Sequence, residues 1–254
     1  MNRILSAAGA LVDRIKINAV LRECRDGRAL WIKRRRWTAR PIMACANRFF
    51  RLAGNPVQAL DDLAMWQRWE VECFLRLHGE RYRAFADGAC AVAAEEVPGE
   101  SLSHHLDAGT LTPRMLEAAG RELRRAHAAE CAVFRGPWSH GDPHAGNFIY
   151  DAAADCARLI DFEVMHDATI CADERHADDV LILLQDMSGR IAAGQWLPNA
   201  HAFLASYGRP EIVARLREKL VMPRGLPRVW WAVRTTYLKS SELERRIRAL
   251  RDSI

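Results

Sequence analysis

Two Asp-Gly pairs, Asp26-Gly27 and Asp87-Gly88, constrain the fold of this chain most strongly. Each pair interrupts a strand-like run in the way that a β-hairpin requires. The first lies in "INAVLRECRDGRALWIKRRR" and the second in "YRAFADGACAVAAEEV", so we expect four strands within the first hundred residues. Between the two hairpins, apolar residues of the segment 57–78 recur three and four positions apart, which predicts a helix.

A change of pattern follows the Pro-Gly pair at residues 98–99. Thr112 and Pro113 have the residue types that begin a helix. Five apolar residues then share one helical face: Met115, Leu116, Ala119, Leu123 and Ala126. The predicted fold class is therefore α+β, with a small antiparallel sheet and one main helix first, and a mainly helical half after it.

The composition is that of a globular protein. The chain has 254 residues, half of them hydrophobic, and no apolar run that reaches the length of a membrane helix. Seven scattered cysteines without a CxxC pair indicate reduced thiols in a cytosolic protein. The short apolar stretch Ile4 to Val12 is expected to be a helix or strand packed on the domain, not a signal peptide.

Basic residues gather at both ends of the chain. Residues 1–40 carry eleven Lys and Arg against three acidic residues, and residues 209–254 carry twelve against five. This balance predicts either an anionic partner or a solvated basic surface. Aromatic and basic residues are mixed in the second segment: Trp230, Trp231, Tyr237, Arg228, Arg234 and Lys239. We interpret them as a helix core with a basic rim, or alternatively as a face for an anionic membrane.

The loop "HGDPHAGN" carries the polar residues with the clearest chemical meaning. His140, Asp142, His144 and Asn147 lie within eight residues, and Asp161 follows the strand-like run "ARLI". Two carboxylates and an amide can provide one base and hard oxygen ligands for Mg²⁺. A second hypothesis is a metal-dependent hydrolase that uses His140, Asp142, His144, Asp161 and His166.

The pair "HGDPHAGN…IDFE" resembles the catalytic loop and metal-binding motif of the protein-kinase-like superfamily, HxDxxxxN followed by DF. The resemblance implies that Asp142 is the catalytic base, assisted by His140 and His144, and that Asn147 and Asp161 bind Mg²⁺. The histidine at position 144 is similar to the small-molecule branch. That branch includes aminoglycoside and choline kinases, lipopolysaccharide-core sugar kinases and the atypical kinases of ubiquinone biosynthesis.

The first hundred residues contain counterparts of the other superfamily positions. Lys33 in "ALWIK" resembles the strand lysine that contacts the nucleotide phosphates, and Glu70 resembles its helix partner, with Glu72 as the competitor. The backbone from Glu95 to Val97 resembles the hinge that faces the adenine.

Other positions depart from the protein-kinase pattern. No GxGxxG loop precedes the lysine, Trp31 stands where protein kinases have a small residue, and Glu163 replaces the glycine of DFG. Asp179 resembles the aspartate that braces the catalytic loop. Only sixteen positions separate it from Glu163, which argues for a small or sugar-like acceptor.

Taken together, the resemblance implies a bilobal fold with an N-lobe over residues 1–97 and a helical C-lobe over residues 98–254. It implies ATP and Mg²⁺ as cofactors and phosphorylation of a sugar or lipid-linked sugar hydroxyl, with lipopolysaccharide core as one acceptor. Aminoglycoside or choline kinases and a nucleotide-binding pseudokinase are the alternatives. We expect a cytoplasmic protein with peripheral contact to an anionic membrane, and no specific nucleic-acid partner.

Overall fold

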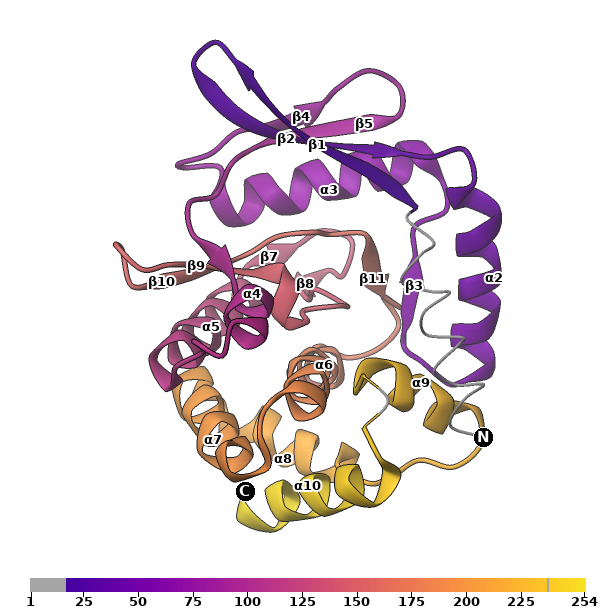
Figure 1. The fold of residues 1–254 in the computed structure, drawn as a ribbon. Helices are drawn as coiled ribbons and strands as arrows, with labels where there is room; N and C mark the ends of the chain where they lie inside the picture. Colours follow the sequence, from indigo (N-terminus) through magenta and orange to yellow (C-terminus); the bar gives the residue numbers. More distant parts are fainter. Residues whose placement is uncertain (1–16, 237) are drawn as a thin grey trace.

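The computed structural model describes residues 17–236 and 238–254 (Figure 1). Its first part is a four-stranded antiparallel sheet with the order β1-β2-β5-β4. The strands are β1 (Asn18–Arg25), β2 (Arg28–Arg35), β4 (Ala84–Ala86) and β5 (Ala91–Glu95). Both predicted hairpins are therefore confirmed. The first turn has positive φ at Asp26 (53°) and Gly27 (75°), as a two-residue turn that matches the strand twist requires.

Helix α3 (Leu63–His78) lies beneath this sheet (Figure 1). Its buried face includes Trp66, Glu70 and Phe74, which are spaced at three and four residues. The helix begins at Leu63 and not at residue 57, where it was predicted to begin. Asp62 caps the helix through a bond from Met65 N, and β3 (Val57–Ala59) instead pairs with β11 (Val164–His166).

A second helix, α2 (Ala39–Leu52), accompanies α3 in this part of the chain, so the expectation of one main helix was incomplete. Asn47 on α2 holds β3 in place, since its side chain accepts from Ala59 N at 2.7 Å and donates to Ala59 O at 2.8 Å. Figure 1 shows α2 running beside β3 at the edge of the molecule, down toward α9.

The rest of the chain is mainly helical, as predicted. Its helices are α4 (Leu102–Asp107), α5 (Pro113–His127), α6 (Ala172–Arg190), α7 (Trp196–Tyr207), α8 (Pro210–Lys219), α9 (Leu226–Arg234) and α10 (Ser240–Ser253). Strand β6 (Glu100–Ser101) precedes α4. Short strands and turns carry the polar loop between α5 and α6: β7 (Glu130–Cys131), β8 (Gly136–Pro137), the 3-10 turn η1 (Ala145–Asn147), β9 (Phe148–Asp151), β10 (Cys156–Leu159) and β11. A further 3-10 turn, η2 (Ala193–Gln195), precedes α7.

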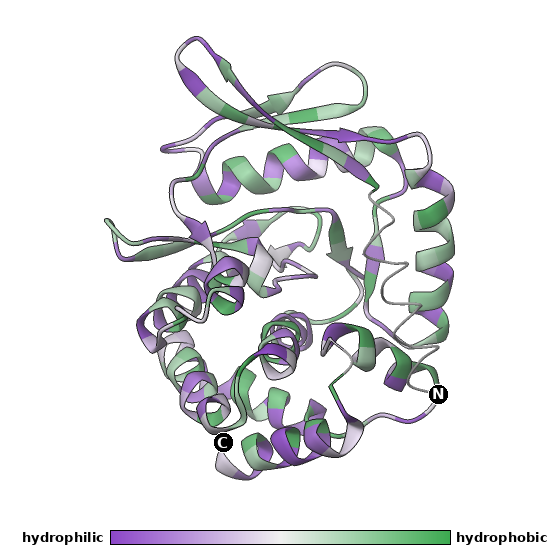
Figure 2. Cartoon of the chain, in the orientation of Figure 1, coloured by the Kyte–Doolittle hydropathy of each residue, from purple (hydrophilic) through white to green (hydrophobic). Residues whose placement is uncertain are grey.

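One hydrophobic cluster connects the first part with the second. It extends from Trp66 and Phe74 on α3 through Trp138 to Phe203 on α7 and Leu250 on α10. Hydrophobic and hydrophilic residues alternate in bands along the helices (Figure 2), as expected for helices that bury one face. The boundary at residue 97 stays a prediction.

Helix α9 supports the first interpretation of its aromatic residues, a helix core with a basic rim, over the alternative of a membrane face. Trp231 is only 8% exposed, and the Trp230 ring packs edge-on against Phe50 at 4.9 Å between centroids. Arg234 lies over the Trp230 ring with its side chain 10% exposed. Trp231 is therefore buried and Trp230 is half-buried against other aromatic side chains, while Tyr237 and the stretch Ile4 to Val12 lie outside the described residues. Within the described residues, no helix has the length and apolar character needed to cross a bilayer.

Candidate active site

Lys33 occupies a central strand of the sheet, paired with Val20 on β1 and Val92 on β5. Successive side chains of a strand point to opposite faces, so Trp31 and Lys33 share one face while Leu30 and Ile32 enter the core on the other. The face that carries Trp31 and Lys33 borders a cavity of about 450 Å³. Helix α3 and the segment after β10 complete the wall around the Lys33 ammonium group.

Three carboxylates converge on that ammonium group. Lys33 Nζ lies 2.7 Å from Glu70 Oε1, 2.5 Å from Asp161 Oδ1 and 3.4 Å from Glu163 Oε1. The expected partner is therefore Glu70, and Glu72 is exposed on the other side of α3. Burial alone would lower the pKa of Lys33, but the negative charges of its three partners raise it above its ordinary value. Lys33 is thus fixed as a cation.

Glu163 also has a shifted pKa. Burial, followed by the negative charge of Asp161, raises the pKa of Glu163 to about 7. The side-chain amide of Asn18 donates to its carboxyl group. Neither Asn18 nor Glu163 was predicted to have a role, and the only signal in the sequence was the departure from the DFG pattern.

Asp161 is placed by the backbone of the polar loop. Ile160 N donates to Asn147 O at 2.9 Å, so the residue before Asp161 is bonded directly to the expected magnesium-binding loop. Asp161 itself adopts a φ of 69°, a conformation that a residue with a side chain rarely takes. Such strain persists only where the surroundings enforce it, and it is often found at functional sites.

The segment after β5 forms the opposite wall of the cavity. Glu95 and Val97 both line it, but the Glu95 carboxylate is already bonded to Arg28 and to the backbone N–H of Arg83. Val97 is buried, and within the described residues neither its N–H nor its C=O has a hydrogen-bond partner. A backbone donor and acceptor without partners beside a cavity are suited to a ligand with complementary edge groups.

The polar loop is held from below by Asp179 on α6. Its two carboxylate oxygens accept from His140 N at 2.7 Å and from Gly141 N at 2.8 Å, and a third bond at 3.0 Å joins it to His127 Nε2. Burial would raise the pKa of Asp179, yet the neighbouring His166 and His127 hold it below its ordinary value. The bracing contact expected of Asp179 is present. Gly141 is required here because its φ is 89° and an added Cβ would lie 3.1 Å from Val164 Cγ2.

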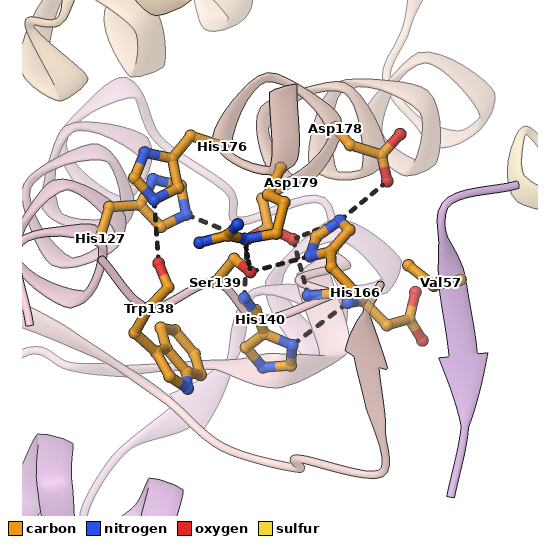
Figure 3. Close-up of polar contacts among 12 residues, drawn as sticks. Val57, His127, Trp138, Ser139, His140, His166, His176, Asp178 and Asp179 are labelled. Atoms are coloured by element: carbon orange, nitrogen blue, oxygen red, sulfur yellow. Dashed lines mark hydrogen bonds and ion pairs between the residues drawn. The ribbon is translucent and has the colours of Figure 1, made fainter. Parts of the chain in front are cut away.

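Figure 3 shows that the bracing aspartate sits within a group of buried histidines. The rings of His127 and His176 stack with 3.8 Å between centroids, and burial followed by the charge of His127 lowers the pKa of His176 to about 3. His166 bonds to Ser139 at 3.0 Å and to Asp178 at 3.2 Å. The sequence gives no local signal for this support, because its members come from segments that are separated along the chain.

His140 differs from its predicted role. It is fully buried, its Nε2 donates to Ile160 O at 3.1 Å, and its Nδ1 accepts from Asp142 N at 3.3 Å. Burial lowers its pKa, so the ring is neutral at neutral pH. Since both ring nitrogens are engaged and no surface is exposed, His140 positions the loop and is not available to contact a substrate.

Asp142 is the accessible carboxylate of the loop, with its side chain 42% exposed. His144 Nε2 lies 4.0 Å from one of its oxygens, and Arg234 Nη2 from α9 lies 3.9 Å from the other. Within the described residues, no donor forms a hydrogen bond to either oxygen, so both remain able to accept one from a bound molecule. Arg234 was missed at this site because the sequence pattern grouped it with a surface face.

The oxygen donors expected for Mg²⁺ fit that ion. The side-chain N–H of Asn147 donates to Asp142 O at 2.8 Å, which leaves the amide oxygen as the free end of the group. The carboxylate of Asp161 lines the cavity. Magnesium prefers few protein oxygens, with phosphates and water completing its shell.

The alternative hydrolase set does not come together. His140 and His166 are fully buried and bonded to protein groups. In the part of the chain that the structure describes, no three His, Cys, Asp or Glu side chains are arranged to hold a metal ion by themselves. A hydrolase built on a protein-ligated zinc ion needs such a set.

Comparisons with known proteins find distant similarity among solved structures alone. No protein-family model matches the chain, and no curated protein matches it. Among solved structures, the chain is similar to Rv3197 from Mycobacterium tuberculosis, in its complex with erythromycin, at 19% identity over 72% of this chain and a TM-score of 0.39. The chain spans about half of that structure, 51% of its length. This similarity is too distant to assign an activity.

Proposed function

We propose that the protein is an ATP-dependent phosphotransferase of the protein-kinase-like superfamily that phosphorylates a hydroxyl group of a sugar or a lipid-linked sugar. One observation carries the proposal: Lys33 Nζ lies between Glu70 and Asp161, at 2.7 and 2.5 Å, on the wall of a cavity large enough for a nucleotide base and sugar. A buried lysine paired with a helix glutamate, beside an aspartate that can bind Mg²⁺, is the arrangement that enzymes of the protein-kinase type use for phosphoryl transfer from ATP.

The cavity offers contacts for the adenine and the phosphates of ATP. The unpaired N–H and C=O of Val97 are suited to the hydrogen-bonding edge of adenine, and the Trp31 ring provides an aromatic surface for the base. The Lys33 ammonium group would bind the phosphate oxygens, with Glu70 fixing its position. These contacts supply binding and orientation without a glycine-rich loop.

Magnesium would be held by Asp161 and Asn147, together with the phosphates. When bound, it would neutralise charge on the phosphate oxygens. Asp161 would then share its carboxylate between Lys33 and the ion. The nearby Glu163, with its pKa raised to about 7, sets the local charge that the ion meets.

Asp142 is the residue proposed to accept the proton of the acceptor hydroxyl. As the hydroxyl oxygen forms its bond to the γ-phosphorus, its proton passes to a carboxylate oxygen of Asp142 and the bond to ADP breaks. His144 and Arg234 flank that carboxylate at about 4 Å. Asp179 and His140 fix the loop so that Asp142 does not have to be ordered during the reaction.

The short connection between Asp161 and α6 supports a small acceptor. It contains only β11 and a turn, and β11 is paired with β3, so little chain remains to dock a protein substrate. A sugar, including a lipopolysaccharide-core sugar, is the acceptor we favour on the resemblance. Aminoglycoside or choline phosphorylation is the runner-up, and a pseudokinase that binds nucleotide without turnover is the third reading.

An acceptor panel tests this proposal directly. Purified protein with Mg²⁺ and ATP would be incubated with core oligosaccharides, simple sugars, aminoglycosides and choline, and phosphorylated products measured by mass spectrometry. We expect one acceptor class to be phosphorylated by the native protein and not by the Asp142→Asn variant. Binding of ATP without any transfer would favour the pseudokinase, and absence of ATP binding would refute the proposal.

A further inference from the structure

A second cavity, of about 570 Å³, lies on a part of the protein that the proposed reaction does not use. Its walls are the C-terminal end of α3 with the following residues 79–82, one side of α5, and β10. It shares no lining residue with the cavity around Lys33. The volume is within the range of small-molecule sites.

The lining of this cavity is strongly basic. Five arginines contribute to it, against two glutamates: Arg76, Arg81, Arg121, Arg125, Arg158, Glu80 and Glu122. Arg125 and Glu122 neutralise each other through two bonds at 2.7 and 2.8 Å. His78 adds no charge at neutral pH, because burial lowers its pKa and its Nε2 donates to Leu159 O. The remaining arginines leave the cavity with a net positive charge.

Arg158 on β10 is the buried arginine of this cavity. The residue is only 8% exposed, and its Nη1 is buried with no hydrogen-bond partner among the described residues. The nearest carboxylate oxygen, Asp151 Oδ2, is 3.9 Å away, and the guanidinium group lies 5.6 Å over the Tyr82 ring. A buried guanidinium without a full set of acceptors is unfavourable unless a ligand supplies them.

We infer that this arginine cavity is a second binding site, for a small molecule that carries several oxyanion charges, such as a phosphorylated metabolite. Guanidinium groups match phosphate and carboxylate oxygens in pairs of parallel hydrogen bonds. Arg158 would bind from the floor of the cavity, while Arg81 and Arg121 would bind from its exposed rim. The walls also contain apolar surface from Leu75 and Ala157, which suits an organic body.

The test measures binding without ATP, so its result does not depend on the proposed function. Inorganic pyrophosphate and glucose 6-phosphate would be titrated calorimetrically into the full chain, with a chelator to remove metal ions, at about 150 mM salt. The Arg81→Gln/Arg121→Gln variant removes two rim charges that are exposed and only weakly paired. Its control is Arg40→Gln/Arg48→Gln, which removes two exposed charges from α2, a helix that contributes nothing to this cavity.

We expect at least one probe to bind, with an affinity at least about tenfold lower in the rim variant and unchanged within about twofold in the control. Arg158→Met should abolish binding while leaving the melting temperature without ligand unchanged or higher, since it removes a buried charge whose nearest carboxylate oxygen is 3.9 Å away. Three results would overturn the inference: no binding of either probe at millimolar concentration, equal losses in the rim and control variants, or full binding by Arg158→Met. Binding that survives the rim variant unchanged would place the probe elsewhere, including at Lys33.

Discussion

Asp142 and Asp161 are carboxylates of the same site with different surroundings. Asp142 is partly exposed, and its oxygens accept no hydrogen bond from the described residues. Asp161 is bonded to Lys33, and although burial acts to raise the pKa of Asp161, the Lys33 charge holds it below its ordinary value. One carboxylate is therefore suited to contact a mobile acceptor, and the other to remain an anion beside a metal ion.

The first prediction concerns Asp142. Replacing it by asparagine keeps the shape of the side chain but removes the proton acceptor, so turnover of the best acceptor should fall by at least about 100-fold. Affinity for ATP, measured by calorimetry, should stay the same, because Asp142 does not line the cavity around Lys33. Near-normal turnover in this variant would remove Asp142 from the mechanism.

Glu163 should make stability depend on pH. Its pKa is about 7 in the folded protein, above the value of about 4.3 expected in the unfolded chain. Between these values the folded state keeps a proton that the unfolded state has lost, so stability falls as pH rises through this window. Glu163→Gln should remove much of that fall, on the order of 2 kcal/mol between about pH 4.5 and 7.5.

Denaturant unfolding across this pH range measures the effect of Glu163→Gln. The control is Glu72→Gln, which removes an exposed glutamate from α3 and should leave the pH profile of the native protein unchanged. Parallel pH profiles for native protein and Glu163→Gln would show that Glu163 ionises normally.

At the scale of elements, the site depends on how β2, α3 and the segment after β10 meet. Lys33 comes from a strand centre, Glu70 from the buried face of a helix, and Phe162 N donates to Glu70 Oε2 at 3.2 Å. The glutamate therefore joins the lysine and the backbone beside Asp161 in one contact. If the sequence of α3 were shifted by one residue along the helix, the carboxylate of Glu70 would point in another direction and lose its contact with Lys33.

A double-mutant cycle tests this joint contact. Lys33→Met and Glu70→Gln should each weaken ATP binding, and the double variant should be little worse than Lys33→Met alone, with a coupling energy of about 1–3 kcal/mol. Glu72→Gln, on the same helix, should bind ATP normally. Strictly additive losses for the first pair would mean that Glu70 does not act through Lys33.

At the scale of the whole molecule, the cavity around Lys33 draws its walls from both parts of the chain. Val92 belongs to the N-terminal sheet, whereas Ile149 on β9 and Ile160 belong to the region that carries the polar loop. A nucleotide in this cavity would contact both parts. Because it would bind only the folded arrangement, it should stabilise the chain as a unit.

Thermal unfolding with Mg²⁺ and ATP measures this stabilisation. At a free nucleotide concentration of about 100 times Kd, native protein should gain ~2.7 kcal/mol of stability. Asp161→Ala should lose the magnesium-dependent part of the gain, and Asn147→Ala should lose less of it. Asp252→Ala, which removes an exposed carboxylate on α10, is the control and should retain the full gain. Equal protection with and without Mg²⁺ in native protein would argue against the metal site.

The sequence alone determined the features that depend on neighbouring residues. Asp26-Gly27 specifies its hairpin because both residues tolerate positive φ, and the spacing of apolar residues on α3 placed Glu70 on the buried face. Only the tertiary structure decided contacts between distant segments. It paired residues 57–59 with β11, buried His140 against Ile160, and brought Arg234 to within 3.9 Å of Asp142. Such contacts depend on which surfaces are buried together, and local periodicity does not encode that pairing.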